Sequence, residues 1–377
     1  MRVVHVSDVY LPRLGGIELH VRDLVERQRA AGHDVAVLTA ARTRSPTDPD
    51  SVVVRLPSRA KPPVLSVRAP LAAARLVREA DPDVVHVHVG VGSPVGFWAA
   101  RTAARAGIPV VVTVHSLWSY AKPIMQAANR LGRFSALPIQ WTAVSRVAAE
   151  HVQRVLPSGT EVGVLLNGID PEFWQISRAR DSNEIVLVAA MRMAIRKRPM
   201  PLLRILDAAR RQVPAEVRMR AVLVGDGPRL PAMRRFVDSR GMQEWVELPG
   251  RLPRERIRDL YRQADAFLAP AELESFGIAA LEARCAGIPV VARAGSGVAE
   301  FVKSGREGLL VEDDEAMREA VVSLCCDPGL RTHVSSNGVD VPFRVTWPGV
   351  LAATEQAYHE AAGAAGRTGT RLAANQG

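Results

Sequence analysis

Cysteine, lysine, aromatic residues and long apolar runs are scarce in this chain, and each shortage excludes a class of protein or site. Three cysteines in 377 residues, at positions 285, 325 and 326, suit neither a disulfide framework nor a zinc site. No apolar run reaches about 18 residues, so the sequence predicts no membrane-spanning helix. Aromatic residues make up 5%, and none lie between the basic positions as stacking platforms, which argues against nucleic acid as a partner.

The N-terminus shows no signal peptide. Met1 and Arg2 lead directly into Val3–Val6, a short apolar run that is typical of a strand. A leader would instead begin with a charged segment and a longer apolar one. We therefore expect a cytoplasmic protein.

Acidic residues are scarce in one part of the first half. The net charge is +10, from 49 basic and 39 acidic residues. Between residues 51 and 149 three acids (Glu79, Asp81 and Asp83) stand against twelve bases: Arg55, Arg59, Lys61, Arg68, Arg75, Arg78, Arg101, Arg105, Lys122, Arg130, Arg133 and Arg146. We interpret this excess as a surface that meets an anionic acceptor or binds peripherally to the inner face of an anionic membrane. The alternative is a coding bias that favours arginine.

The order of apolar runs predicts two α/β domains. Val3–Val6 is expected as a strand, Ile17–Ala30 as a helix and Val35–Leu38 as the next strand, and the same alternation resumes at Ile185–Ala189. This order favours doubly wound parallel sheets. The chain is long enough for two separate cores. The Pro-rich, basic stretch 51–70 is expected to be an exposed loop or an irregular edge and not a linker.

The most informative stretch is Pro270–Glu282. It follows a strand-like run and leads into an Ala- and Leu-rich helix, expected from Ile278 with Ser275 as its N-cap, that ends at Gly287. A helix that opens after a strand offers free N–H groups to an anion. Eight residues of helix would separate Glu274 and Glu282 by roughly 12 Å and about 80°, so we expect both carboxylates to share one broad helical face. A diphosphate at the helix end, with carboxylates beside it for sugar hydroxyls, describes a nucleotide-sugar site. Ordinary solvated charge is the alternative.

This stretch resembles the E-x7-E region of the retaining glycosyltransferases of family 4. The resemblance extends over nearly the whole chain through five further motifs: the P-x-x-G-G-x-E loop at Pro12–Glu18, T-x-H ending at His115, N-G-[IV]-D at Asn167–Asp170, the pair Arg192 and Lys197 of G-R-x-x-x-x-K-G, and V-G-x-G-P at Val224–Pro228. Met191 and Arg198 replace the two glycines of the fourth motif. The resemblance implies the GT-B fold, in which two Rossmann-like doubly wound domains face each other across a cleft.

The resemblance also implies a role for each matching residue. Catalytic residues would be His115, Arg192, Lys197 and Glu274, with His115 on the donor sugar and the two bases neutralising the diphosphate as the glycosidic bond breaks. Donor-binding residues would be Gly15, Gly16, Arg192, Lys197, Glu274, Phe276, Gly277, Ile278 and Glu282. In this set Glu282 would bind the ribose, Glu274 the sugar hydroxyls, and residues 276–278 would offer backbone N–H groups.

The same resemblance divides the chain. Residues 1–170 would form an acceptor-side domain and 171–342 the domain that binds the nucleotide sugar. Residues 343–361 would form a helix that returns to the first domain, and 362–377 a disordered tail.

Patterns for other cofactors are weak. His86 and His88 alternate along one strand at a spacing that suits a metal, but no third ligand is evident. Asp81-Pro-Asp83 precedes a strand, whereas the metal-binding D-x-D of other glycosyltransferases follows one. Gly90–Gly96 imitates a dinucleotide fingerprint, but no acid for a ribose follows the next strand. We predict no metal and no cofactor beyond the donor substrate, a GDP- or UDP-sugar.

The function predicted is the retaining, metal-independent transfer of a hexose, with a lean to mannose or glucose, onto a lipid-linked or saccharide acceptor. A secondary metabolite is an alternative acceptor. Another enzyme class on the same fold stays open, although a phosphorylase needs a pyridoxal lysine and lysine occurs only at positions 61, 122, 197 and 303. A catalytically silent partner protein is the remaining alternative.

Overall fold

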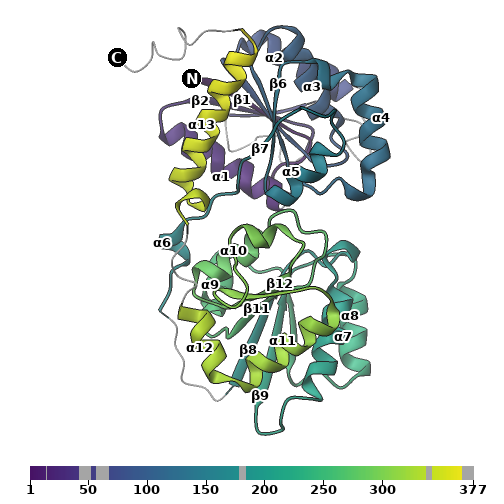
Figure 1. The fold of residues 1–377 in the computed structure, drawn as a ribbon, viewed down its shortest axis with the longest axis vertical. Coiled ribbons are helices and arrows are strands. Elements are labelled where there is room, and N and C mark those ends of the chain that lie inside the picture. Colours follow the sequence, from purple (N-terminus) through teal and green to yellow (C-terminus); the bar gives the residue numbers. More distant parts are fainter. Residues whose placement is uncertain (14, 42–51, 57–67, 178–183, 337–341, 367–377) are drawn as a thin grey trace. The chain divides into compact units, whose positions relative to one another are not determined.

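A computed structural model describes residues 1–13, 15–41, 52–56, 68–177, 184–336 and 342–366. The chain divides into two compact units (Figure 1). Met1–Gly168 and Trp347–Gly377 form the N-terminal unit, and Ile169–Thr346 form the C-terminal unit. Within the described residues, no helix has the length and apolarity needed to cross a membrane.

The N-terminal unit is built on a parallel sheet of seven strands in the order β3-β2-β1-β4-β5-β6-β7. The strands are β1 (Arg2–Ser7), β2 (Asp34–Thr39), β3 (Val53–Arg55), β4 (Val84–Val89), β5 (Val110–Val114), β6 (Ile139–Ala143) and β7 (Val162–Val164). The helices are α1 (Gly16–Ala30), α2 (Arg68–Ala80), α3 (Pro94–Arg105), α4 (Lys122–Gly132), α5 (Arg146–Gln153) and α13 (Trp347–Ala364), the last of which packs on β4, β5 and β6.

The C-terminal unit holds a parallel sheet of six strands in the order β10-β9-β8-β11-β12-β13. Its strands are β8 (Glu184–Ala190), β9 (Arg218–Val224), β10 (Val246–Gly250), β11 (Ala266–Ala269), β12 (Val290–Arg293) and β13 (Gly308–Val311). Its helices are α6 (Pro171–Trp174), α7 (Pro199–Arg210), α8 (Leu230–Ser239), α9 (Arg254–Tyr261), α10 (Ile278–Cys285), α11 (Asp314–Cys326) and α12 (Pro328–Ser336). Two Rossmann-like parallel sheets with helices confirm the predicted fold class.

Each sheet reverses its strand order at one point, and ligands of such sheets bind there, beyond the carboxyl ends of the strands. In the N-terminal unit the reversal lies between β1 and β4, and in the C-terminal unit between β8 and β11. Helices cover both faces of the sheet near these points, so every residue of β4 and β5 is buried, including the polar His86, His88 and Thr113. The loops that follow β1, β4, β8 and β11 are therefore where function is expected.

Three details of the expected boundaries were wrong. The last helix begins at Trp347 and not at residue 343, because Pro348 fits only in a first turn. The same helix continues to Ala364, so residues 362–364 are not part of a disordered tail, while 367–377 lie outside the described residues. The stretch 51–70 contains β3 and the start of α2, although 57–67 also lie outside.

Candidate functional site

The loops after β8 and β9 are locked together in the C-terminal unit. Met193 donates its backbone N–H to Asp226 O at 3.0 Å, and Arg229 donates its own to Met193 O at 2.9 Å. A Cβ on Gly225, whose φ is +137°, would lie 1.8 Å from Met191 O. Only glycine permits this backbone approach. The loop after β9, residues 225–229, therefore packs against the basic loop 191–198 and holds it in place.

Lys197 and Glu274 meet at the point where the strand order reverses. Lys197 Nζ lies 2.5 Å from Glu274 Oε2, and the two side chains are 34% and 17% exposed. Lys197 comes from the loop after β8 and Glu274 from the loop after β11. The structure thus brings two of the predicted site residues into an ion pair. Arg192, in the same loop as Lys197, is exposed and forms no ion pair with an acid of the described residues.

Glu274 is not helical, so the expectation that Glu274 and Glu282 share a helical face was wrong. α10 begins at Ile278, and its N-cap is Gly277 with a φ of +93°, not Ser275. The turn is fixed from the next loop, where Gly297 donates its N–H to Glu274 O at 2.8 Å. Phe276 is buried and packs on Phe301 with ring centroids 5.2 Å apart. Glycine starts this helix because the chain must turn sharply into it.

Glu282 lies on α10 and is 8% exposed. Arg254 Nη2 lies 3.4 Å from Glu282 Oε1, and its guanidinium covers the ring of Trp174 at 5.5 Å. The nearby Tyr261 hydroxyl has a raised pKa, first because it is buried and second because the Glu282 charge opposes its ionisation. The buried carboxylate of Glu282 is therefore held beside Arg254.

Sequence reasoning missed a cluster of two arginines and two acids, which adjoins Lys197 and Glu274 along the chain. Arg198 contacts Glu272 at 2.9 Å and Asp314 at 2.6 Å, and Arg293 contacts the same two acids at 3.0 and 2.7 Å. Arg198 replaces a glycine of the resembled motif and adopts a left-handed φ of +56°. The two ion pairs hold it in that conformation. No pattern along the sequence links these four residues.

The predicted site residues of the N-terminal unit lie after β1 and β5. Gly15 caps α1, and a Cβ on it would lie 2.5 Å from Glu18 Oε2. Gly16 is the first residue of the helix. His115 follows β5, is 8% exposed, and its ring lies 5.5 Å from that of His20 on α1.

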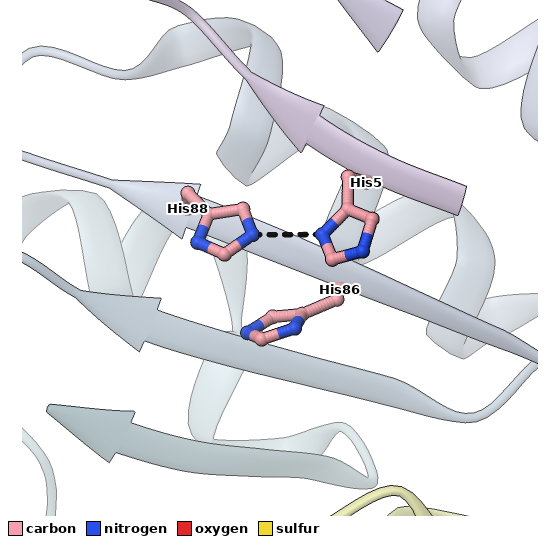
Figure 2. A group of neighbouring side chains, drawn as sticks. All are labelled: His5, His86 and His88. Atoms are coloured by element: carbon pink, nitrogen blue, oxygen red, sulfur yellow. Dashed lines mark hydrogen bonds between the residues drawn. The ribbon is translucent and has the colours of Figure 1, made fainter. Parts of the chain in front are cut away.

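His115 belongs to a buried histidine cluster, which we define as His5, His20, His86, His88 and His115. His5 supplies the third histidine that the sequence did not reveal, because β1 pairs with β4 in a register that places His5 opposite His86. One ring nitrogen from each of His5, His86 and His88 lies within 4.8 Å of the others, close enough in principle for a metal (Figure 2).

All six ring nitrogens of these three histidines have protein partners. His5 contacts Gln28 Oε1 at 2.7 Å and His88 Nε2 at 2.9 Å, the bond drawn in Figure 2. His86 contacts Tyr358 Oη at 2.9 Å and Thr113 Oγ1 at 2.7 Å, and His88 Nδ1 contacts His115 Nε2 at 3.0 Å. The ring nitrogens of these three histidines are thus all hydrogen-bonded to protein groups without a metal.

Burial keeps these histidines neutral. It lowers the pKa of His5 and of His20 to about 4. The pKa values of His86, His88 and His115 lie well below the usual range, again chiefly through burial and further through neighbouring histidines.

Comparison with known proteins connects both units with one group of enzymes. Residues 14–173 match the family described as Glycosyltransferase Family 4, and residues 170–340 match Glycosyl transferases group 1. The chain is 27% identical over 350 residues to GDP-mannose-dependent alpha-(1-6)-phosphatidylinositol monomannoside mannosyltransferase of Mycolicibacterium smegmatis, covering 86% of this chain and 89% of that relative.

Two further matches cover almost the whole chain. It is 29% identical over 391 residues to GDP-mannose:cellobiosyl-diphosphopolyprenol alpha-mannosyltransferase of Xanthomonas oryzae pv. oryzae, covering 96% of this chain and 98% of the relative. HepE of Anabaena, solved in complex with UDP and glucose, has the same fold with a TM-score of 0.73 at 19% identity, covering 94% of this chain and 98% of that one.

Proposed function

We propose that this chain, which belongs to the GT-B glycosyltransferases of the family 4 type, transfers a hexose with retention from a nucleotide-diphosphate sugar to a lipid-linked acceptor. The observation that carries the proposal is the Lys197–Glu274 pair at the strand-order reversal of the C-terminal unit. A cation for phosphate and a carboxylate for hydroxyls stand side by side there, next to the start of a helix.

Each site residue is assigned a role in this reaction. Lys197 and Arg192 neutralise the charge that grows on the leaving diphosphate. Glu274 accepts hydrogen bonds from donor-sugar hydroxyls, Glu282 accepts them from the ribose, and the N–H groups of residues 276–278 bind the sugar or phosphate. His115 contacts the donor sugar, and the Gly15–Gly16 loop faces the donor phosphates and the acceptor.

The reaction needs no protein nucleophile in this proposal. The acceptor hydroxyl attacks the sugar on the face from which the diphosphate departs, so configuration is retained, and a phosphate oxygen takes the hydroxyl proton. The bond to the diphosphate breaks as the bond to the acceptor oxygen forms. We propose no metal and no cofactor, since Lys197 and Arg192 supply positive charge where a metal ion would otherwise do so.

The names of the relatives support the donor and acceptor classes. The relative from Xanthomonas oryzae is named for GDP-mannose and a diphosphopolyprenol, and the relative from Mycolicibacterium smegmatis for GDP-mannose and a phosphatidylinositol monomannoside. Both acceptors are amphiphiles with phosphate groups. We therefore propose a lipid acceptor with an anionic head and a mannosyl or glucosyl donor, of which both names favour the mannosyl one.

The surface of α4 suits an anionic lipid bilayer. Ile124 and Leu131 are 66% and 83% exposed, and the exposed bases Arg130 and Arg133 lie beside them. No acid occurs on this helix. The two arginines also line a surface hollow of about 590 Å³ together with Asn129. Apolar side chains that enter a membrane, flanked by bases for lipid phosphates, are typical of peripheral binding.

Thermal unfolding with nucleotide sugars tests the donor site. GDP-mannose, UDP-glucose, UDP-N-acetylglucosamine, GDP and UDP are added to the wild type and to Glu282→Gln. A donor at 100 times its dissociation constant should stabilise the wild type by about 2.7 kcal/mol, and the variant should lose most of this shift. If no nucleotide shifts the wild type, the donor site is refuted and a catalytically silent partner becomes the better hypothesis.

A further inference from the structure

The hydrogen bonds around the histidine cluster have a direction that begins at a backbone carbonyl. Val112 O can only accept, and Thr142 Oγ1 donates to it at 3.1 Å. A hydroxyl has one proton. Thr142 Oγ1 also lies 2.8 Å from Thr113 Oγ1, so in that contact Thr113 must be the donor.

The direction continues through His86 to Gln28. Thr113 has donated its proton, so at 2.7 Å it accepts from His86 Nε2–H. A neutral imidazole carries one proton, so His86 Nδ1 accepts from the Tyr358 hydroxyl at 2.9 Å. Tyr358 in turn accepts from Gln28 Nε2 at 2.9 Å. These steps fix the orientation of the Gln28 amide, with its oxygen toward His5.

From Gln28 the direction passes along three histidines. His5 Nε2–H donates to Gln28 Oε1 at 2.7 Å, so His5 Nδ1 accepts from His88 Nε2–H at 2.9 Å. His88 Nδ1 then accepts from His115 Nε2–H at 3.0 Å. With its one proton on Nε2, His115 carries its lone pair on Nδ1. The tautomer of His115, at the carboxyl end of β5, thus follows from Val112 O through an unbroken chain of hydrogen bonds.

We propose that Gln28 is a positioning residue, whose amide orientation fixes His115 in the tautomer with Nδ1 as a hydrogen-bond acceptor. His115 Nδ1 then accepts a hydrogen bond from a donor-sugar hydroxyl and cannot donate one to it. This second half rests on the proposed function, whereas the hydrogen-bond direction does not. Gln28 is 1% exposed and lies on α1, so it acts only through the cluster.

The same direction argues against a metal at His5, His86 and His88. A metal takes a lone pair from each ligand, and the lone-pair nitrogen of each of these neutral histidines already accepts a hydrogen bond from a neighbour. Metal binding would therefore break the chain in three places.

Gln28→Glu tests the proposal by reversing the chain. A carboxylate beside His5 favours the protonated imidazole, and a doubly protonated His5 must donate to His88 Nε2. His88 then donates from Nδ1 to His115 Nε2, so His115 becomes the Nδ1–H tautomer. Long-range ¹H–¹⁵N spectra of the histidine-labelled full chain distinguish the tautomers. We expect Nε2–H at His5, His86, His88 and His115 in the wild type, and a charged His5 with Nδ1–H at His115 in the variant.

Gln356→Glu, on the exposed face of α13, is the matched control and should leave every histidine signal in place. If Gln28→Glu does not fold, Tyr358→Phe replaces it, because it cuts the link to Val112 O and should give a mixture of tautomers at His115. An unchanged His115 tautomer in the folded variant would overturn the proposal, as would one equivalent of zinc in the purified wild type.

The catalytic half has a separate readout. Turnover of the donor by Gln28→Glu should fall roughly tenfold, the effect of one lost hydrogen bond to the substrate. A reversed tautomer with unchanged turnover would leave the hydrogen-bond direction standing and refute the role of His115. Absence of any donor turnover in the wild type, with the expected spectra, would refute the proposed function alone.

Discussion

Lys197 Nζ and Glu274 Oε2 lie 2.5 Å apart, although the residues belong to loops that follow different strands. Each holds the other in place at the reversal of the strand order. In the proposed reaction Lys197 binds the donor phosphate, whereas Glu274 binds the sugar hydroxyls. The pair therefore fixes the position of two donor-binding groups before a donor arrives.

Removing Lys197 should affect activity far more than stability. Lys197→Ala is expected to lower kcat about 100-fold, because positive charge at the leaving diphosphate is lost. The free energy of unfolding should change by less than about 1 kcal/mol, since the pair is partly exposed. Lys303→Ala, an exposed lysine in the same unit, is the control for both measurements. Equal activity in the two variants would contradict the assignment.

Arg198 should be strained by its left-handed backbone. Both Arg198→Ala and Arg198→Gly lose the ion pairs to Glu272 and Asp314, but only alanine keeps a Cβ at a φ of +56°. The alanine variant should therefore be less stable than the glycine variant by about 1 kcal/mol in urea unfolding.

The same pair of substitutions at Arg196 is the control for this strain. Arg196 has no left-handed φ, so there glycine should be the less stable variant. If the glycine variant were the less stable one at both positions, the backbone of Arg198 would be unstrained.

Acid should destabilise the N-terminal unit over a defined pH range. The unfolded chain takes up protons at its histidines near pH 6.5, whereas His5 and His20 in the native state take them up only near pH 4. The free energy of unfolding is therefore retained above pH 6.5 and lost as the pH falls from 6.5 toward 4. Each buried histidine contributes up to about 1.4 kcal/mol per pH unit.

Calorimetry in buffers of different ionisation enthalpy measures this proton uptake. At pH 5.5 the five histidines of the cluster are neutral in the native state and mostly protonated in the unfolded chain. Unfolding should therefore bind about four protons. The exposed His359 is the control, and His359→Gln should leave the uptake unchanged. Uptake near zero would mean that the cluster is already protonated in the native state.

Gly225 should be required for the conformation of the loop 191–198, which contains Lys197. Gly225→Ala places a Cβ 1.8 Å from Met191 O, so either the loop moves or the unit loses at least about 2 kcal/mol of stability. Gly295→Ala, which meets no atom within 4 Å, is the matched control. Denaturant unfolding and donor binding should both change in the first variant only.

Local patterns predicted the fold and several turns because they depend on neighbouring residues. The strand runs became parallel strands, and Gly287 ends α10 with a φ of +74°. The expected start of α10 at Ile278 was right, but its N-cap is Gly277 and not Ser275, because the turn before the helix depends on a hydrogen bond from Gly297, in another loop. The sequence did not predict that His5 lies beside His86, because that contact depends on the register between β1 and β4. Contacts of this kind are set by packing and have no periodicity to reveal them.

α13 has a consequence for how the chain is made. Its Tyr358 completes the hydrogen bonds of His86 and Gln28, yet the ribosome adds residues 169–346 before this helix. At about 5 to 20 residues per second, the first unit waits roughly 10 to 40 s for its last helix. During that interval β4, β5 and β6 lack the cover that α13 provides. A chain that terminates early, before Trp347, would leave that side of the sheet open to chaperones and proteases.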